Sequence, residues 1–78
     1  MSKNVRMLKY TNANNGISVY MTYENNDART VSIMDDMGHE SNFWFDNAID
    51  AVGAYNRVFY IIASRNDATF DDAFDAVG

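Results

Sequence analysis

Apolar and polar residues alternate along much of the first 45 residues, the pattern typical of half-buried β-strands. The clearest case is residues 17–24, where Ile17, Val19, Met21 and Tyr23 are every second residue. One face of this strand is therefore expected to lie in the core. The same reasoning predicts strands over residues 5–10, 17–24, 29–34 and 41–45.

Turn-forming residues separate these segments. Asn15 and Gly16 tolerate the positive φ angles of a hairpin turn, and Asp27 and Gly38 lie in the next two polar connections. Short turns between consecutive strands predict an antiparallel meander. Residues 41–45, SNFWF, also fit the first turn of a helix, but their aromatic content favours a strand.

After Asp46 the apolar spacing changes to three and four residues, which indicates one face of a helix. The apolar positions are Ile49, Val52, Tyr55, Phe59 and Ile62. We expect this helix to be capped by Asp46 and to run to about Ser64. The sheet face that it covers is expected to consist of Ile17, Val19, Met21, Val31 and Ile33. On this assignment, Phe59→Ala should lower the free energy of unfolding by about 3 to 5 kcal/mol.

Gly53 lies inside the predicted helix, where glycine lowers stability by about 1 kcal/mol relative to Ala. A close approach of the sheet or of a second helix would account for a glycine at this position.

A second helix is expected from Thr69 or Phe70 to Val77. A helix this short is not stable alone in water and must dock on the rest of the chain. A chain of 78 residues buries enough surface for one core. The prediction is therefore one α+β domain over residues 1–78, with an antiparallel three- or four-stranded meander followed by one long and one short helix, in the order ββββαα.

A nine-residue sequence occurs twice, as FDNAIDAVG at 45–53 and FDDAFDAVG at 70–78, with seven of nine positions identical. One interpretation is convergence on a good helix start, with an aspartate cap and a second aspartate four residues later. The other is a duplicated surface element that presents matching acidic pairs. These pairs would be Asp46 with Asp50, and Asp71 with Asp75.

Charge divides the chain into two halves. Residues 1–34 carry four basic and two acidic side chains, a net charge of +2, whereas residues 35–78 carry two basic and nine acidic ones, a net charge of −7. The net charge of −5 opposes a general attraction to phosphate or to an anionic membrane. The acidic half is either a solvated face or a surface that complements a basic partner. The residues expected to bind such a partner are Asp46, Asp50, Asp71, Asp72 and Asp75.

No residue pattern points to catalysis. The chain has no cysteine, so it has neither a disulfide nor a thiolate zinc site. His39 is the only histidine, and its spacing from Asp35, Asp36 and Glu40 matches no established set of metal ligands. We therefore expect no enzyme activity, no catalytic residue, no metal and no cofactor.

The amino end does not resemble a signal peptide and the longest apolar run is too short to cross a bilayer, which predicts a cytoplasmic protein without membrane contact.

The aromatic residues divide into two groups. Those expected in the core are Phe43, Phe45, Tyr55, Phe59 and Phe70. Those expected on the opposite face of the sheet are Tyr10, Tyr20 and Trp44, close to Arg6, Lys9 and Arg29. Exposed rings beside basic residues could stack the bases of a single-stranded nucleic acid, or anchor a protein partner.

A short antiparallel meander followed by acidic helices, on a chain rich in Asn, Asp, Tyr and Met and lacking Cys and Pro, resembles small phage-encoded host-takeover proteins, among them anti-CRISPR and DNA-mimic inhibitors. The resemblance covers the whole chain in style, matches no family motif and assigns no residue a role. It implies a non-catalytic protein that blocks a host factor.

Three functional hypotheses follow. The first is an acidic protein-binding module, an inhibitor that occupies the basic nucleic-acid-binding or assembly surface of a host protein in the host cytoplasm. The second is a small structural subunit that assembles through an apolar or sheet interface, as a homodimer for example. The third is a single-stranded nucleic-acid binder that uses the sheet.

Overall fold

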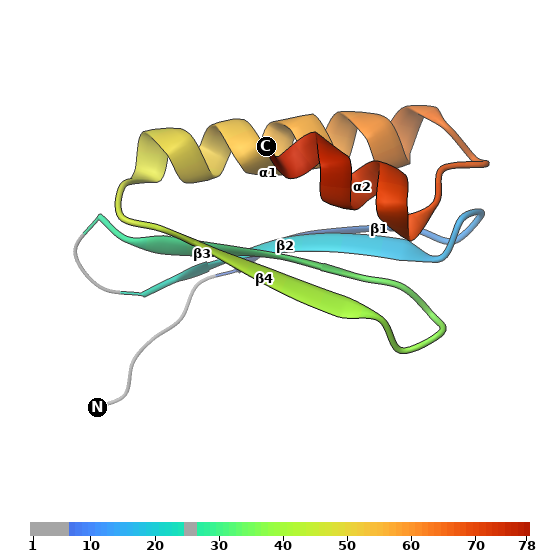
Figure 1. Cartoon of the computed structure of the whole chain (residues 1–78), viewed down its shortest axis with the longest axis horizontal. Helices are drawn as coiled ribbons and strands as arrows, with labels where there is room; N and C mark the ends of the chain where they lie inside the picture. The colour runs from blue at the N-terminus through green and yellow to red at the C-terminus, as the bar shows by residue number, and fades with distance from the viewer. Residues whose placement is uncertain (1–6, 25–26) are drawn as a thin grey trace.

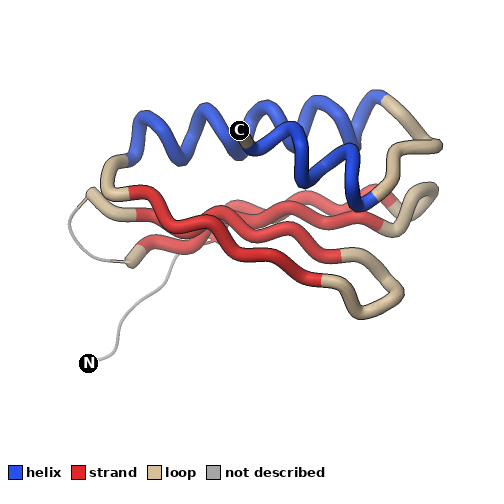
Figure 2. Tube along the Cα trace, viewed as in Figure 1, coloured by secondary structure: helices blue, strands red, loops and turns tan. Residues whose placement is uncertain are grey.

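Four strands and two helices form two layers (Figure 1). The computed structural model describes residues 7–24 and 27–78. Its elements are β1 (Met7–Asn12), β2 (Ile17–Tyr23), β3 (Arg29–Met34), β4 (Glu40–Phe45), α1 (Ala48–Ser64) and α2 (Phe70–Val77). The strands pair antiparallel in the order β1-β2-β3-β4, and both helices lie on one face of the sheet (Figure 2). The predicted α+β fold with the order ββββαα is confirmed, including the strand at residues 41–45.

Where the structure describes them, the predicted strand bounds are correct to within two residues. Residues 5 and 6 of the first predicted strand lie outside the described residues. β1 continues beyond Tyr10, because Thr11 and Asn12 still pair with Ser18 and Ile17 before the chain turns. The other three strands begin and end within one residue of the prediction.

The centre of the core is the helix-facing side of β2 and β3. All five side chains predicted for this face are buried, each with at most 2% of its surface exposed. They are Ile17, Val19, Met21, Val31 and Ile33. Their burial confirms the strand periodicity, since a shift of one residue would place every one of them in water.

The side of α1 that faces the sheet differs from the prediction. Its buried residues are Ala51, Ala54, Val58 and Ile62. Of the predicted stripe only Ile62 is fully buried, and three members are exposed. These are Ile49 at 84%, Val52 at 41% and Phe59 at 39%. The reason is steric: the small alanines let the helix backbone lie close to the sheet, and the larger Tyr55 and Phe59 lie at its side. There the Phe59 ring meets Tyr10, with centroids 4.9 Å apart, so the prediction that Tyr10 points away from the helices is wrong.

The N-cap of α1 is Asn47 and not Asp46. The Asn47 side chain accepts a hydrogen bond from the Asp50 amide at 2.8 Å. The Asp27 carboxylate from the β2–β3 connection accepts a second one from the Ala48 amide at 3.2 Å. Two side chains therefore accept hydrogen bonds from the amides at this helix start. The predicted cap, Asp46, lies one residue before the actual one.

The three remaining helix ends agree with the prediction. α1 ends at Ser64, and α2 covers Phe70–Val77 after Thr69 as N-cap. The Thr69 hydroxyl accepts from the Asp72 amide at 3.2 Å, and the Asp72 carboxylate accepts from the Thr69 amide at 3.0 Å. This reciprocal capping box stabilises the start of α2, and an eight-residue helix also requires docking on the rest of the chain.

The β1–β2 turn joins the sheet to the end of α1. The Asn12 amide group, on a side chain only 7% exposed, donates to the carbonyl of Ile62 at 2.8 Å. Asn15 donates to the same carbonyl and to that of Arg65, both at 2.9 Å. Gly16 follows with a φ of 73°, a left-handed conformation that suits glycine. The turn residues thus also cap a helix end that has no basic residue of its own in its last turn.

The two copies of the nine-residue sequence form different structures. In the first, Phe45 ends β4 and the helix begins three residues later, whereas in the second the helix begins at Phe70 itself. Consequently Val52 is 41% exposed while its counterpart Val77 is only 6% exposed. The interpretation as a duplicated surface element is wrong.

Gly53 does not mark a close approach of the sheet or of α2, because an added Cβ would meet only the Arg57 guanidinium, at 3.4 Å.

Candidate protein-binding surface

An apolar groove of about 500 Å³ lies between β4 and the last turn of α2. Its walls are Phe43, Trp44 and Phe45 from β4, and Phe74, Asp75, Val77 and Gly78 from the end of α2. The rings of Phe43 and Phe74 meet edge to face, with centroids 5.3 Å apart. Phe74 remains 45% exposed and Trp44 64% exposed. Large aromatic side chains that are partly open to water are common anchors of protein interfaces.

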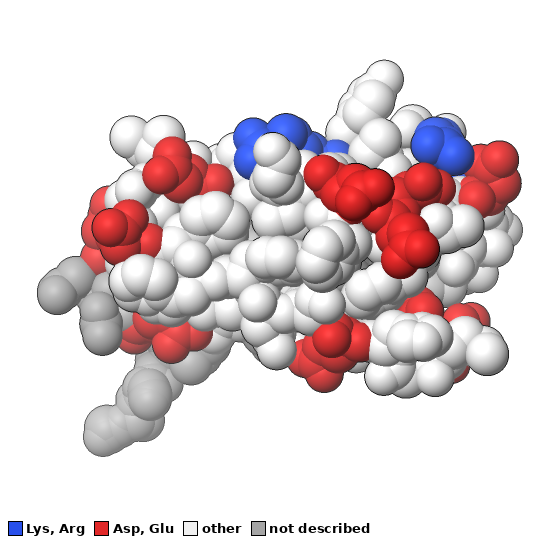
Figure 3. Space-filling model, in the orientation of Figure 1, with Lys and Arg blue, Asp and Glu red and all other residues white. Residues whose placement is uncertain are grey.

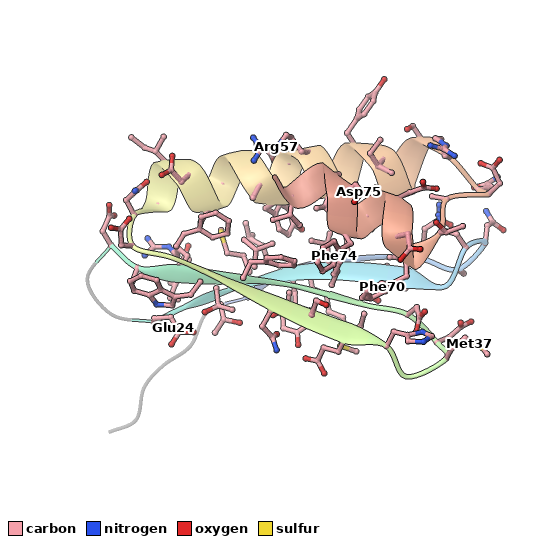
Figure 4. The ribbon with its side chains drawn as sticks, viewed as in Figure 1. Glu24, Met37, Arg57, Phe70, Phe74 and Asp75 are labelled. Atoms are coloured by element: carbon pink, nitrogen blue, oxygen red, sulfur yellow. The ribbon has the colours of Figure 1, made fainter. Side chains whose placement is uncertain are left out.

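The groove exists because α2 is too short to cover β4. The carboxyl end of α2 lies above the middle of the sheet, while α1 runs along the sheet's whole length (Figure 1). Figure 4 shows Phe70 and Phe74 projecting from α2 toward the sheet. Phe43, Phe45 and Phe70, which were predicted as core residues, pack against the core but are only partly buried.

The two elements that frame the groove carry acidic side chains and no basic ones. β4 has the sequence ESNFWF and α2 the sequence FDDAFDAV. Figure 3 shows red acidic patches over this side of the molecule, while the blue basic side chains visible there lie along the helix layer. Arg57, labelled in Figure 4, donates to the carbonyls of Ala76 at 3.1 Å and Val77 at 2.7 Å, where the negative end of α2 lies. The groove is therefore apolar, with acidic side chains on its two framing elements and the Arg57 guanidinium at the end of α2.

The five predicted partner-binding aspartates occupy three separate places. Asp46 and Asp50 come together at the start of α1, where both carboxylates accept from the Asn47 amide group, at 2.9 and 3.1 Å. Asp71 and Asp72 lie in the first turn of α2, and Asp75 lies one turn later, at the groove. The structure thus separates the α1 pair from the α2 residues and brings one of the five into the apolar surface.

Asp72 has a structural role that sequence reasoning did not assign. The hydrogen bond from the Thr69 amide holds the pKa of this carboxyl below its ordinary value, and the charge of Arg65, 3.4 Å away, acts in the same direction. Asp72 therefore stabilises α2 whether or not a partner is present.

The β3–β4 turn contains the only histidine of the chain. Asp35 accepts hydrogen bonds from the Met37 and His39 amides at 3.0 and 2.9 Å, and its second oxygen lies 2.8 Å from Nδ1 of His39. Desolvation raises the pKa of Asp35, but these hydrogen bonds outweigh it and lower the pKa overall. The His39 ring also lies 5.7 Å from that of Phe70, so the pair holds the turn beside α2. Within residues 7–24 and 27–78, no three acidic or histidine side chains are grouped as metal ligands would be.

The helix-free face of the sheet is rich in hydroxyl and amide groups. Thr11 bonds Ser18 at 2.7 Å, and the Tyr20 hydroxyl donates to Glu40 at 3.2 Å. Strand alternation places Lys9, Tyr20 and Trp44 on this face. The prediction is thereby confirmed for the rings of Tyr20 and Trp44. Arg29 instead lies on the helix side, with its guanidinium 4.2 Å from the centre of the Tyr23 ring. Arg6 lies outside the described residues. The basic and aromatic platform of the nucleic-acid hypothesis is therefore divided between two faces.

No helix in the described part of the chain is both long and apolar enough to cross a membrane. Comparisons of the chain with protein-family models, with curated proteins and with solved structures gave no match. Function must accordingly be argued from the surface itself.

Proposed function

We propose that this chain is a non-catalytic protein-binding module that docks its α2–β4 side on a basic surface of another protein. Where that surface is the nucleic-acid-binding site of the partner, the chain acts as an inhibitor by occupying it. The observation that carries the proposal is an exposed aromatic groove framed by two elements that have four acidic residues and no basic ones. Apolar anchors provide affinity, and the surrounding charge speeds encounter and selects the partner.

The binding determinants differ from those expected from sequence. Asp72 is engaged in capping α2, and Asp46 and Asp50 lie at the start of α1. Asp75, which lines the groove, and Asp71, which is exposed beside it on the same helix, are the acidic residues of α2 left for a partner. Phe74 is the corresponding apolar anchor in the groove, and Trp44 offers a second exposed ring on the opposite face of the sheet at the same edge.

Partner capture with a matched pair of charge-reversal variants tests this function. Immobilised parent protein, Asp75→Lys and Asp67→Lys are compared in cell lysate, with mass spectrometry to identify what binds. The two variants change the net charge equally, but Asp67 lies in the α1–α2 connection, with its side chain 86% exposed. The parent and Asp67→Lys should retain the same basic partner and Asp75→Lys should lose it. Retention of that partner by Asp75→Lys would contradict the proposal.

A structural subunit is the second candidate, because the same groove could bury its aromatic side chains in an assembly. Salt separates the two functions. A contact steered by charge weakens as salt is raised from about 0.05 to 0.5 M, whereas an apolar contact does not. Sedimentation of the purified protein measures self-association directly, and a dimer that persists at high salt would favour the subunit.

A further inference from the structure

We infer that the groove receives an extended segment of a basic partner that adds to the sheet as a fifth strand beside β4. This inference rests on the proposed function and specifies how the partner binds. The segment has apolar residues at alternate positions and basic residues between them.

β4 has an open edge with known polarity. The sheet order places β4 last, and it pairs only with β3 among the described strands. The bond from the Asp35 amide to the His39 carbonyl, 3.0 Å, begins the β3–β4 ladder. Because hydrogen-bonded and non-bonded pairs alternate in an antiparallel ladder, the amides of residues 41, 43 and 45 point to β3. The backbone groups of residues 40, 42 and 44 therefore point outward.

This edge lacks the features that usually prevent strand addition. Its sequence, ESNFWF, contains no Pro and no Lys, and its one charged residue is at the first position. The opposite edge, β1, carries Lys9. β4 is consequently the better template for an added strand.

Side-chain sites flank the edge on both faces of the sheet. Residues of an added strand would alternate between the two faces. On the helix side they would meet the groove formed by Phe43, Phe45 and Phe74, which suits apolar side chains. On the other side they would meet Glu40 and the exposed ring of Trp44, which suit a cation through charge and through the face of the ring.

Charge identifies the occupant as a basic partner and disfavours a second copy of this chain. Each chain has a net charge of −5, and pairing two β4 edges would bring two acidic α2–β4 sides together. A basic segment would instead gain from the carboxylates of Glu40 and Asp75.

Synthetic peptides test this mode of binding. The probe is a capped peptide of about eight residues in which Arg and Ile alternate, a length that matches one strand. The matched peptide has Glu in place of Arg. Two further analogues carry N-methyl groups on all the Ile or on all the Arg residues. Trp44 is the only tryptophan of the chain, so its fluorescence reports binding at this edge.

The expected result is asymmetric. The Arg–Ile peptide should bind and the Glu–Ile peptide should not. Only one edge of an added strand pairs with β4, so one N-methylated analogue should bind about tenfold more weakly and the other should resemble the parent peptide. Amide exchange should slow at residues 40, 42 and 44 when the peptide is bound.

Three results would overturn strand addition: no binding of the Arg–Ile peptide at about 1 mM, equal binding of the two N-methylated analogues, or unchanged exchange at residues 40, 42 and 44. Each of these leaves the proposed function standing if partner capture still depends on Asp75. Loss of that dependence overturns the proposed function instead.

Discussion

Asn12→Asp should be strongly destabilising, because Asn12 links the sheet to the end of α1. Its side chain is 7% exposed, donates from Nδ2 to the Ile62 carbonyl at 2.8 Å and accepts at Oδ1 from the Asn14 amide at 2.9 Å. Aspartate has nearly the same shape, but it presents an acceptor oxygen where the amide donates. At neutral pH the variant places a buried negative charge against a carbonyl at the negative end of a helix.

The size of the effect follows from what remains bonded. The Ile62 carbonyl keeps the hydrogen bond from Asn15 at 2.9 Å, so it is not left without a donor. The cost is then that of two lost donor contacts, to the Ile62 carbonyl and, at 3.4 Å, to Asn66 Oδ1, and of a carboxylate held among acceptors with little water, about 2 to 4 kcal/mol. Small domains have a total stability near the lower end of about 5 to 15 kcal/mol, so this loss is a large fraction of it.

Urea unfolding followed by circular dichroism measures the loss, with Asn14→Asp as the control. Asn14 is exposed in the same turn and donates to Asn66 at 3.2 Å, so its substitution adds the same charge. We expect the control to cost less than about 1 kcal/mol. Similar losses in the two variants would refute the view that the buried link, and not the charge of the turn, is responsible.

The destabilisation should also depend on pH. Burial raises the folded-state pKa of the introduced carboxyl above its unfolded value of about 3.9. The penalty is therefore complete above the folded pKa and fades as the pH falls toward the unfolded one, because the protonated group can donate to Ile62 again. A difference between Asn12→Asp and the parent that is the same at pH 7 and at about pH 4 would contradict this explanation.

Three further predictions concern the helices. Gly53→Ala should raise stability by about 0.5 to 1 kcal/mol and the melting temperature by a few degrees, since the new methyl group meets nothing closer than 3.4 Å; a lower melting temperature would disprove it. Phe59→Ala should cost about 1 to 2 kcal/mol in urea unfolding, less than a fully buried phenylalanine, because Phe59 is 39% exposed and mainly loses its contact with Tyr10. Asp72→Asn should lower the melting temperature at pH 7 but not near pH 2. The Thr69 amide lowers the pKa of Asp72 in the folded state. The stability that Asp72 contributes is therefore present above its unfolded-state pKa and is lost as the pH falls through its folded-state pKa.

The fold was predictable because each strand carries its own signal. The alternation of Ile17, Val19 and Met21 requires only a sheet with one covered face, and the structure buries all three. The rotation of α1 was not predictable from hydrophobicity in the same way. Ala51 and Ala54 are weakly apolar, and what places them against the sheet is the close approach of two backbones, a property of the packed layers and not of the helix alone.

Contacts between distant residues account for most of what the sequence did not show. Asn12 and Asn15 have the composition of a turn, and nothing local indicates that they also bond the end of a helix some 50 residues later. The groove depends in the same way on where α2 ends relative to β4. The length of α2 was predicted correctly. An eight-residue helix spans about 12 Å and a six-residue strand about 20 Å, so the sequence already indicated that α2 could not cover all of β4.

Asp75 is the residue of α2 whose position the fold does not explain. Asp71 and Asp72 lie in the first turn, where the helix dipole favours negative charge, but Asp75 lies near the end, where the dipole opposes it. A residue placed against the local rule is often retained for function at a cost in stability. Asp75→Lys should therefore melt about 2 to 5 °C higher than the parent while binding the basic partner more weakly. Thermal melts and partner capture on the same preparation check both effects, and a variant that melts lower while binding normally would show that Asp75 belongs to the fold.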